Sequence, residues 1–190
     1  MESLITKLYK TKKTIFNIQE LALIWGKTER NDLYSSVSYY VRTKALVRLS
    51  RGLFAIDKKY NRKELGVHIY TPSYISFETV LREEGVIFQH YEDIFLAGKW
   101  PIEKNINNQN FVFRKIKDIV LYNLEGIETK DNYSIATLER AFLDMIYLFP
   151  DYYFDNLENI NWDKCFKIVK IYKNKELVKR LNKYCKDNVK

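Results

Sequence analysis

The clearest structural pattern of this chain lies in residues 14–56, TIFNIQELALIWGKTERNDLYSSVSYYVRTKALVRLSRGLFAI. Asn17 and Glu20 have the spacing of a capping box, in which each side chain accepts a hydrogen bond from the other residue's backbone amide. A helix is therefore predicted to begin after Asn17. Its apolar stripe consists of Ile18, Leu21, Ala22 and Trp25, at positions i, i+3, i+4 and i+7. Gly26 supplies the left-handed conformation that ends many helices.

A second helix is predicted a few residues later, with Asn31 or Asp32 as its cap. One face is marked by Leu33, Val37, Tyr40, Val41 and Lys44, and the other by Ser35, Ser38, Tyr39 and Arg42. No Asp or Glu occurs in residues 33–56, whereas a solvent-exposed helix ordinarily mixes both signs of charge. Short hydroxyl side chains and an arginine suit a helix that approaches base edges in the major groove of DNA.

The next segment, ALVRLSRGLFAI, predicts a β-hairpin with strands at residues 46–49 and 53–56 and a basic turn between them. Two helices followed by a hairpin are the order of a winged helix-turn-helix, in which the second helix reads a groove and the hairpin contacts the backbone. Lys27 and Arg30 lie in the turn between the helices, where they are suited to phosphate contacts. The expected DNA-binding residues are Lys27, Arg30, Ser35, Ser38, Tyr39, Arg42, Lys44, Arg48 and Arg51.

The net charge of +8 is unevenly distributed along the chain. Residues 1–63 hold 14 Lys and Arg against 5 Asp and Glu, residues 64–163 hold 8 against 17, and residues 164–190 hold 10 against 2. Basic segments raise the affinity for phosphate backbones by releasing condensed counterions, but a basic excess is also typical of a solvated surface. The helical geometry of residues 14–56 therefore carries the argument for DNA, and a winged helix that binds a protein instead stays open as an alternative.

Length and composition predict a folded protein of two domains. Hydrophobic residues make up 46% of the 190 residues and aromatic residues 15%, which argues against disorder. We expect a winged helix-turn-helix domain in residues 1–63 and a larger domain in residues 64–190. The first residues lack the apolar stretch of a secretory signal, and no run reaches the roughly 20 apolar residues of a membrane span. We therefore expect a cytoplasmic protein with no membrane partner.

The larger domain is predicted to be a mixed α/β unit, which makes the whole chain an α+β protein. In PSYISFETVLREEGV, residues 72–86, Ser76 is the expected cap of a short helix and Gly85 its end. The residues of this block expected in the core are Tyr74, Ile75, Phe77 and Leu81. Short apolar runs rich in Ile, Val, Phe and Tyr follow in residues 93–133 and predict a small antiparallel sheet.

Helices are predicted for the rest of the chain, the first of them capped by Thr137. Its inward stripe is expected to be Leu138, Ala141, Phe142, Met145 and Phe149. Arg140 and Asp144 are spaced i, i+4 and are interpreted as a pair near the outer side that contributes a few tenths of a kcal/mol. From Trp162 onward, apolar residues interleaved with lysine fit two amphipathic helices. Their lysines contact a nucleic-acid backbone, keep the surface soluble, or dock against the acidic middle of the chain, and these alternatives stay open.

Three blocks of the sequence resemble the AbiEi family of type IV antitoxins and its relatives. They are LALIWGKTERNDLYSSVSYYVRTKALVRLSRGLFAI, TPSYISFETVLREEGVI and YSIATLERAFLDMIYL, all within residues 14–149 and in the order of the family. The block PSYISFET with its later glycine is the most specific of the three. Leu138 stands where the family tends to have proline, and because leucine is a good helix former, the helix is still expected to form.

The resemblance implies a bacterial protein with a winged-helix domain joined to a carboxy-terminal antitoxin domain. It further implies a repressor that binds double-stranded operator DNA of its own operon and neutralises a toxin of nucleotidyltransferase type. Type IV systems are understood to neutralise without a stable complex of toxin and antitoxin. The toxin is therefore expected to be a functional partner without being a tightly bound one.

The sequence contains no motif that supports an enzyme. Its six glycines are scattered and form neither a phosphate-binding loop nor a dinucleotide fingerprint, and the D-x-D spacing of nucleotidyltransferases is missing. His68 and His90 are the only histidines and lack the spacing of a metal or nucleophile motif. Cys165 and Cys185 have no neighbouring histidine and are expected to be reduced packing residues. We expect no catalytic residue, no metal and no cofactor.

Three functional hypotheses remain open on this evidence. The leading one is an autoregulating antitoxin that binds operator DNA; the second is a winged-helix module that binds a protein; the third is an RNA-binding regulator that uses the basic carboxy-terminal tail. The first requires the cationic and hydroxyl side chains of residues 27–51 to face solvent together. It fails if the carboxy-terminal half of the chain covers Ser35, Tyr39 and Arg42.

Overall fold

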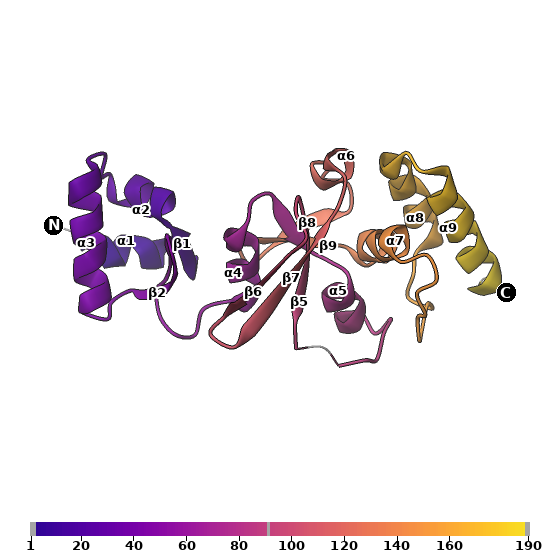
Figure 1. Cartoon of the computed structure of the whole chain (residues 1–190), viewed down its shortest axis with the longest axis horizontal. Coiled ribbons are helices and arrows are strands. Elements are labelled where there is room, and N and C mark those ends of the chain that lie inside the picture. The colour runs from indigo at the N-terminus through magenta and orange to yellow at the C-terminus, as the bar shows by residue number, and fades with distance from the viewer. Residues whose placement is uncertain (1–2, 91, 189–190) are drawn as a thin grey trace.

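The computed structural model describes residues 3–90 and 92–188 and shows an α+β protein. Figure 1 shows an elongated molecule in which the helices of the amino-terminal part form one end, a large sheet lies in the middle, and the last helices form the other end. Among the described residues, no helix has both the length and the apolar character needed to cross a membrane.

The amino-terminal part combines three helices with a small sheet. Its elements are α1 (Leu4–Lys10), β1 (Ile15–Asn17), α2 (Ile18–Trp25), α3 (Arg30–Arg42), β2 (Val47–Ser50) and β3 (Leu53–Ala55). The strands pair antiparallel in the order β1-β3-β2, so the predicted hairpin is confirmed. The cluster between the helices and the sheet consists of Leu8, Phe16, Leu21, Trp25, Leu33, Val37, Leu46, Phe54 and Ile56. This small core holds α3 by one face only.

The local signals of α2 are confirmed. The Asn17 side chain accepts a hydrogen bond from the Glu20 amide, and the Glu20 carboxylate accepts one from the Asn17 amide, both at 2.9 Å. Gly26 follows the helix at φ 66°, in the left-handed region that a residue without Cβ adopts at no steric cost. A capping box and a glycine stop are short-range signals, which is why the sequence alone predicts both ends of this helix.

The predicted cap of α3 is wrong. The helix begins at Arg30, so its cap is Glu29, two or three residues before the expected Asn31 or Asp32, and Glu29 makes no side-chain hydrogen bond to the first turn. Asp32 lies inside that turn, and its two carboxylate oxygens accept hydrogen bonds from the Lys27 ammonium at 2.7 and 2.6 Å. An acidic side chain in the first turn is favourable toward the helix dipole, so Asp32 stabilises the helix without capping it.

A six-stranded sheet forms the centre of the carboxy-terminal part. Its strands are β4 (Ser73–Ile75), β5 (Ile94–Gly98), β6 (Ile102–Ile106), β7 (Gln109–Lys115), β8 (Ile127–Lys130) and β9 (Tyr133–Ala136), in the order β6-β7-β5-β4-β9-β8. The prediction of a small antiparallel sheet is wrong, because β5 pairs parallel with β7 and β4 pairs parallel with β9. The apolar β7 takes the inner place beside β5, and the mostly exposed β6 folds back along its outer edge. Burial of apolar side chains thus decides the strand order.

Helices cover this sheet and extend beyond it. They are α4 (Arg62–Ile69), α5 (Glu78–Glu83), α6 (Asp118–Leu121), α7 (Leu138–Leu148), α8 (Trp162–Ile168), the 3₁₀ helix η1 (Val169–Tyr172) and α9 (Lys175–Asn188). Two helices in the tail were expected, and α8 and α9 confirm this. Leu177 and Leu181 of α9 are fully buried, whereas its lysines are exposed.

The helix α7 starts as predicted and ends differently. The Thr137 side chain accepts a hydrogen bond from the Arg140 amide, and the helix begins at Leu138, so leucine does support a first turn here. Of the predicted inward stripe, Ala141, Phe142 and Met145 are buried and Leu138 is half-buried. Phe149 lies past the helix end and is 39% exposed, so its assignment to the core is wrong.

The segment around α5 corrects a second cap assignment. Phe77, at φ 56°, occupies the cap position, while the Ser76 hydroxyl donates a 2.8 Å hydrogen bond to the Asp144 carboxylate. Gly85 is left-handed at φ 69° just after the helix, as predicted. The residues predicted to pack here, Tyr74, Ile75, Phe77 and Leu81, are all buried. Ser76 therefore belongs to a tertiary hydrogen-bond network that its local sequence does not predict.

The interpretation of Arg140 and Asp144 as an outer pair is wrong, because both side chains are fully buried. Asp144 accepts hydrogen bonds from the hydroxyls of Tyr74 at 3.0 Å, Ser76 at 2.8 Å and Tyr172 at 2.6 Å. Arg140 donates to the backbone oxygens of Val120 at 2.8 Å and Glu125 at 2.7 Å. Burial raises the pKa of Asp144, against the lowering effect of the Arg140 guanidinium and the three hydroxyl donors. The i, i+4 spacing is the same on buried and exposed helix faces, so it does not predict which face is covered. Here α7 is packed against α5, α8 and α9, and the pair is buried.

Polar contacts join the two parts of the molecule. The buried Glu64 carboxylate in α4 accepts hydrogen bonds from the amide of Thr14 at 3.0 Å and from its hydroxyl at 2.6 Å. His68, one turn later, lies with Nε2 3.4 Å from a Glu20 carboxylate oxygen and with Nδ1 2.9 Å from the Glu64 carbonyl oxygen. Apolar residues of β1 and β3 join the larger core as well. The strands β1 and β3 are thus buried on both sides of the small sheet, whereas β2 stays partly exposed.

Candidate nucleic-acid interface

The helix α3 presents its polar face to solvent at the amino-terminal end of the molecule. Leu33 and Val37 on its other face are buried in the small core. The predicted groove-facing residues Ser35, Ser38, Tyr39 and Arg42 are all exposed, and the exposed fraction of Tyr39 is 51%. In Figure 1, α3 and the carboxy-terminal helices lie at opposite ends of the molecule. The carboxy-terminal half therefore does not cover this face.

Arginine and tyrosine side chains pair along this face. The Arg30 guanidinium carbon lies 5.5 Å from the centre of the Tyr34 ring, and that of Arg42 lies 5.9 Å from the centre of the Tyr39 ring. Neither guanidinium forms an ion pair with a carboxylate among the described residues. A guanidinium near an aromatic ring keeps its rigid fork of N–H donors available for a planar acceptor such as phosphate or a guanine edge.

Lys27 is placed differently from the prediction. Its ammonium lies 2.6 Å from an Asp32 carboxylate oxygen, so it is already neutralised by an ion pair. Glu29 is exposed beside it, and the end of α3 where the helix begins therefore carries two acids. A phosphate at this end has to displace Asp32 from Lys27. The acid-free stretch begins at Leu33, which is why it does not reveal this neutralisation.

The remaining predicted cations follow α3 along the chain. Lys44 is exposed at φ 60° just after the helix, and Arg48 is exposed on β2 with its guanidinium carbon 5.6 Å from the Phe54 ring centre. Arg51 in the hairpin turn is exposed and lines a cleft of about 600 Å³ between the hairpin, α2, α4 and the edge strand β6. Lys104 of β6 faces the same cleft. The predicted set is therefore divided between the α3 surface and this cleft.

Lys104 is a candidate contact that reasoning from the sequence missed. It lies 53 positions after Arg51 in an acidic part of the chain, and only the packing of β6 beside the hairpin brings the two cations to one cleft. Periodicity describes residues within one element and contains no information about such a neighbour.

The described residues offer little support for other site chemistries. Among residues 3–90 and 92–188, no group of three or more His, Cys, Asp and Glu side chains is arranged to hold a metal ion. Cys165 is buried and Cys185 half-buried, and both are free thiols. Burial raises the pKa of the Cys165 thiol, which disfavours the reactive thiolate.

Two comparisons with known protein sequences identify no relative of this chain. No protein-family model matches the chain, and a search of curated protein sequences finds no similar protein. The resemblance to AbiEi antitoxins therefore stays a prediction that depends on its three sequence blocks. The functional argument depends on the surface of α3.

Proposed function

We propose that this chain is a transcriptional regulator that binds double-stranded operator DNA through an amino-terminal winged helix-turn-helix. The element order α1-β1-α2-α3-β2-β3 and the strand order β1-β3-β2 support the proposal. In such a module α3 is the helix that enters the major groove, and the β2–β3 hairpin is the wing. No step of the proposal requires a metal, a cofactor or catalysis.

The exposed polar face of α3 is the observation that carries this proposal. The major groove is about 12 Å wide and accepts an α-helix whose contacting side chains are short or flexible. Ser35 and Ser38 allow that close approach, and both are exposed. Arg42 then supplies the fork of donors for a guanine edge or a phosphate. Lys44 and Arg48 follow the end of α3 and are suited to the flanking phosphates.

DNA binding is tested with a labelled duplex from the region upstream of the gene, titrated with the full-length protein at several salt concentrations. We expect log K to fall steeply with log salt, with a slope of about −0.9 for each phosphate contact. Arg42→Ala or Arg51→Ala is expected to weaken binding by about 1–3 kcal/mol, and Lys130→Ala on β8 serves as the matched loss of an exposed cation. Unchanged binding by both arginine variants would overturn the proposal.

We further propose that the regulator is the autorepressing antitoxin of a type IV toxin-antitoxin system. The sequence blocks that resemble AbiEi support this role, and its partner is a toxin of nucleotidyltransferase type that is not held in a stable complex. Co-expression with the neighbouring gene is the test, and restored growth is the expected result. Arg42→Ala is a useful second arm, because it is expected to lose repression of a reporter while still restoring growth. Absence of rescue by the wild-type chain contradicts the antitoxin role.

A protein-binding role for α3 is the second candidate, and one observation favours it. Tyr34 and Tyr39 are 44% and 51% exposed on the same helix, and exposed tyrosines are typical of protein interfaces. The two roles differ in their dependence on salt, since phosphate contacts produce a steep decrease in affinity and an aromatic interface does not. Capture of a protein partner that survives high salt, together with absence of duplex binding, would favour this candidate.

A further inference from the structure

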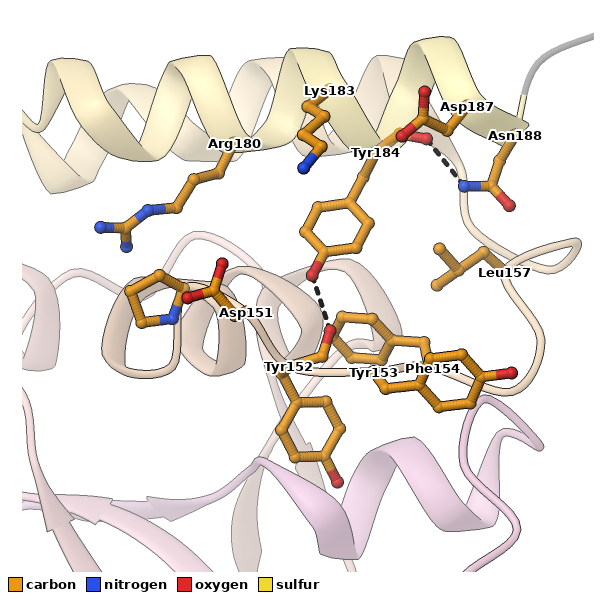
Figure 2. Close-up of a pocket in the computed structure, with 11 residues that line it drawn as sticks. Asp151, Tyr152, Tyr153, Phe154, Leu157, Arg180, Lys183, Tyr184, Asp187 and Asn188 are labelled. Carbon is orange, nitrogen blue, oxygen red and sulfur yellow. Dashed lines mark hydrogen bonds between the residues drawn. The ribbon is translucent and has the colours of Figure 1, made fainter.

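A pocket of about 530 Å³ lies at the end of the molecule opposite to α3, between α9 and residues 150–157. Figure 2 shows Lys183 and Tyr184 extending from α9 toward the chain segment that carries Tyr152, Tyr153 and Phe154. The pocket thus combines aromatic rings with a cation. Figure 1 places α9 far from the proposed duplex-binding helix, so this pocket is a separate surface of the protein.

The aromatic side of the pocket is held in place by its own contacts. The Tyr184 hydroxyl donates a 2.6 Å hydrogen bond to the Tyr152 carbonyl oxygen. The Phe154 ring centre lies 5.5 Å from that of Tyr184 in an edge-on geometry and 5.0 Å from that of Tyr152 in a tilted one. Tyr153, in contrast, is 79% exposed. The rings of Tyr152, Phe154 and Tyr184 are therefore held in place before a ligand binds. The exposed ring of Tyr153 is available for stacking with a flat ligand.

The charges of the pocket divide by role. Arg180 donates a 2.9 Å hydrogen bond to the Ile146 carbonyl oxygen and so caps the end of α7. Lys183 forms no ion pair with a described carboxylate and extends into the pocket. Asp151 and Asp187 also line the pocket, which keeps a phosphate out of its interior and leaves acceptors for the N–H groups of a base.

Lysines continue from this pocket over the outer surface of the last helices. Those exposed on α8, η1, α9 and their connections are Lys164, Lys167, Lys170, Lys173, Lys175, Lys179, Lys183 and Lys186. Lys179 is paired with Glu176 at 2.8 Å, and this pair is exposed. The helix α9 has 14 residues and is therefore about 21 Å long, enough for several successive phosphates. The surface thus offers a basic track that ends at an aromatic pocket.

We infer that the carboxy-terminal helices bind a single-stranded polynucleotide, with phosphates along the lysines of α9 and one unstacked base against Tyr153 in the pocket. A single strand turns a base into such a pocket without breaking a base pair, whereas a duplex has to unpair and unstack the base at a cost of a few kcal/mol. An anionic membrane is a poorer fit, because the apolar side of α9 is occupied: Leu177 and Leu181 are buried in the core. The inference does not depend on the function of α3.

The test is a binding titration of the full-length protein with labelled oligonucleotides of about 12 nucleotides, within the usual site size of single-strand-binding folds. Three probes of the same base sequence are compared: single-stranded RNA, single-stranded DNA and duplex DNA. We expect the wild type to bind single strands, with a salt slope of about −0.7 for each phosphate contact. Preference for RNA indicates contacts to the 2′-hydroxyl, and equal binding of RNA and DNA indicates base and phosphate contacts alone; both support the inference.

Five variants separate a specific site from unspecific charge in this titration. Tyr153→Ala and Lys183→Glu are each expected to weaken single-strand binding at least about fivefold, since stacking alone contributes about 1–3 kcal/mol per base. Tyr153→Phe keeps the ring and is expected to bind like the wild type, as is Lys130→Glu, which reverses an exposed charge on β8. Arg42→Ala is expected to leave single-strand binding unchanged, so failure of the duplex proposal and failure of this inference are distinguishable.

Two results would overturn the inference. In the first, Tyr153→Ala binds single strands as tightly as the wild type. This result would show that binding depends on the lysine charges alone and that no base stacks against Tyr153. In the second, vesicles of phosphatidylserine compete as strongly as the oligonucleotide and are affected only by Lys183→Glu. Circular dichroism of each variant confirms that it is folded, and the 79% exposure of Tyr153 makes a folding defect of its alanine variant unexpected.

Discussion

The helices α3 and α7 carry similar patterns and have opposite environments. Each has an apolar stripe at helical spacing and a polar face that includes an arginine. On α3 the arginine, Arg42, is exposed beside Tyr39, whereas on α7 the arginine, Arg140, is fully buried. The difference arises because α3 touches the small core by one face at the end of the molecule, while α7 is surrounded by α5, α8, α9 and the sheet.

The comparison teaches what a polar helix face means in each setting. A polar face that remains open is available for a partner, and its side chains contribute little to stability. A polar face that becomes covered has to satisfy every donor and acceptor internally, and no buried side-chain nitrogen or oxygen among the described residues lacks a hydrogen-bond partner. Removing the arginine of α7 should therefore change the free energy of unfolding, whereas removing the arginine of α3 should change the affinity for a partner.

The largest expected effect is on the free energy of unfolding after Arg140→Ala. This change leaves the Asp144 carboxylate buried without its cation and is expected to cost about 3–5 kcal/mol. Urea denaturation followed by circular dichroism measures it. Arg42→Ala on α3 is the matched control, with an expected change within about 0.5 kcal/mol. A loss below about 1 kcal/mol for Arg140→Ala would show that the buried network is not needed for stability.

The next effect concerns binding by the open face. Ser38→Glu places a carboxylate where the proposed duplex has its phosphates and base edges, while glutamate is itself a good helix former. We expect the affinity for the upstream duplex to fall about tenfold, or roughly 1.4 kcal/mol, with unfolding unchanged. Thr129→Glu on β8 adds the same charge at another exposed position and should bind like the wild type. Equal weakening by both variants would point to net charge in place of a specific contact.

The same comparison explains which features the sequence predicts. The capping box at Asn17, the stop at Gly26, the cap at Thr137 and the hairpin depend on neighbours within a few residues, and all of them are present. Solvent exposure of the α3 face follows from its acid-free polar pattern, because a covered face of unpaired cations would be too costly.

The features that the sequence does not predict are those decided by distant partners. The burial of Arg140 depends on Tyr74 and Tyr172, which lie 66 residues before it and 32 after it. The parallel pairing of β5 with β7 depends on which strand buries more apolar surface. Serine is a residue type that is favoured at helix caps, yet the hydroxyl of Ser76 donates its hydrogen bond to a carboxylate 68 residues away. In each case a distant partner, either a hydrogen-bonding group or an apolar surface, outweighs the local propensity.

A smaller effect is expected where the open face is partly neutralised. Asp32→Asn removes the carboxylate that binds Lys27 and so frees an ammonium at the beginning of α3. We expect duplex affinity to rise about threefold at low salt and the salt slope to become steeper by about 0.9, the value for one added phosphate contact. The double variant Lys27→Ala, Asp32→Asn is the control and should lose the steeper slope. An unchanged slope in Asp32→Asn would place Lys27 outside the interface.

The smallest effect concerns the junction between the open and the covered regions, where His68 meets Glu20. Burial opposes both charges, but the hydrogen bonds of His68 with Glu20 and Glu64 raise the pKa of His68, and those from His68, Lys13 and the Asn17 amide lower the pKa of Glu20 to about 2. The His68–Glu20 ion pair therefore contributes its full stabilisation between the ordinary pKa of a carboxylate, about 4.5, and that of histidine, about 6.5. Its contribution disappears as pH rises through the folded pKa of His68 and as pH falls toward 2.

Comparison of the wild type with His68→Gln over this pH range tests the sign of the effect. We expect the wild type to be more stable by about 1 kcal/mol or less between pH 4.5 and 6.5, and this advantage to shrink as pH rises above that window. Melting temperatures at several pH values measure it. Lys13→Gln is a matched control, because it removes a second partner of Glu20 without removing the histidine titration. Parallel stability curves for the wild type and His68→Gln would show that the junction is held by Thr14, Glu64 and apolar packing alone, with no contribution from the histidine charge.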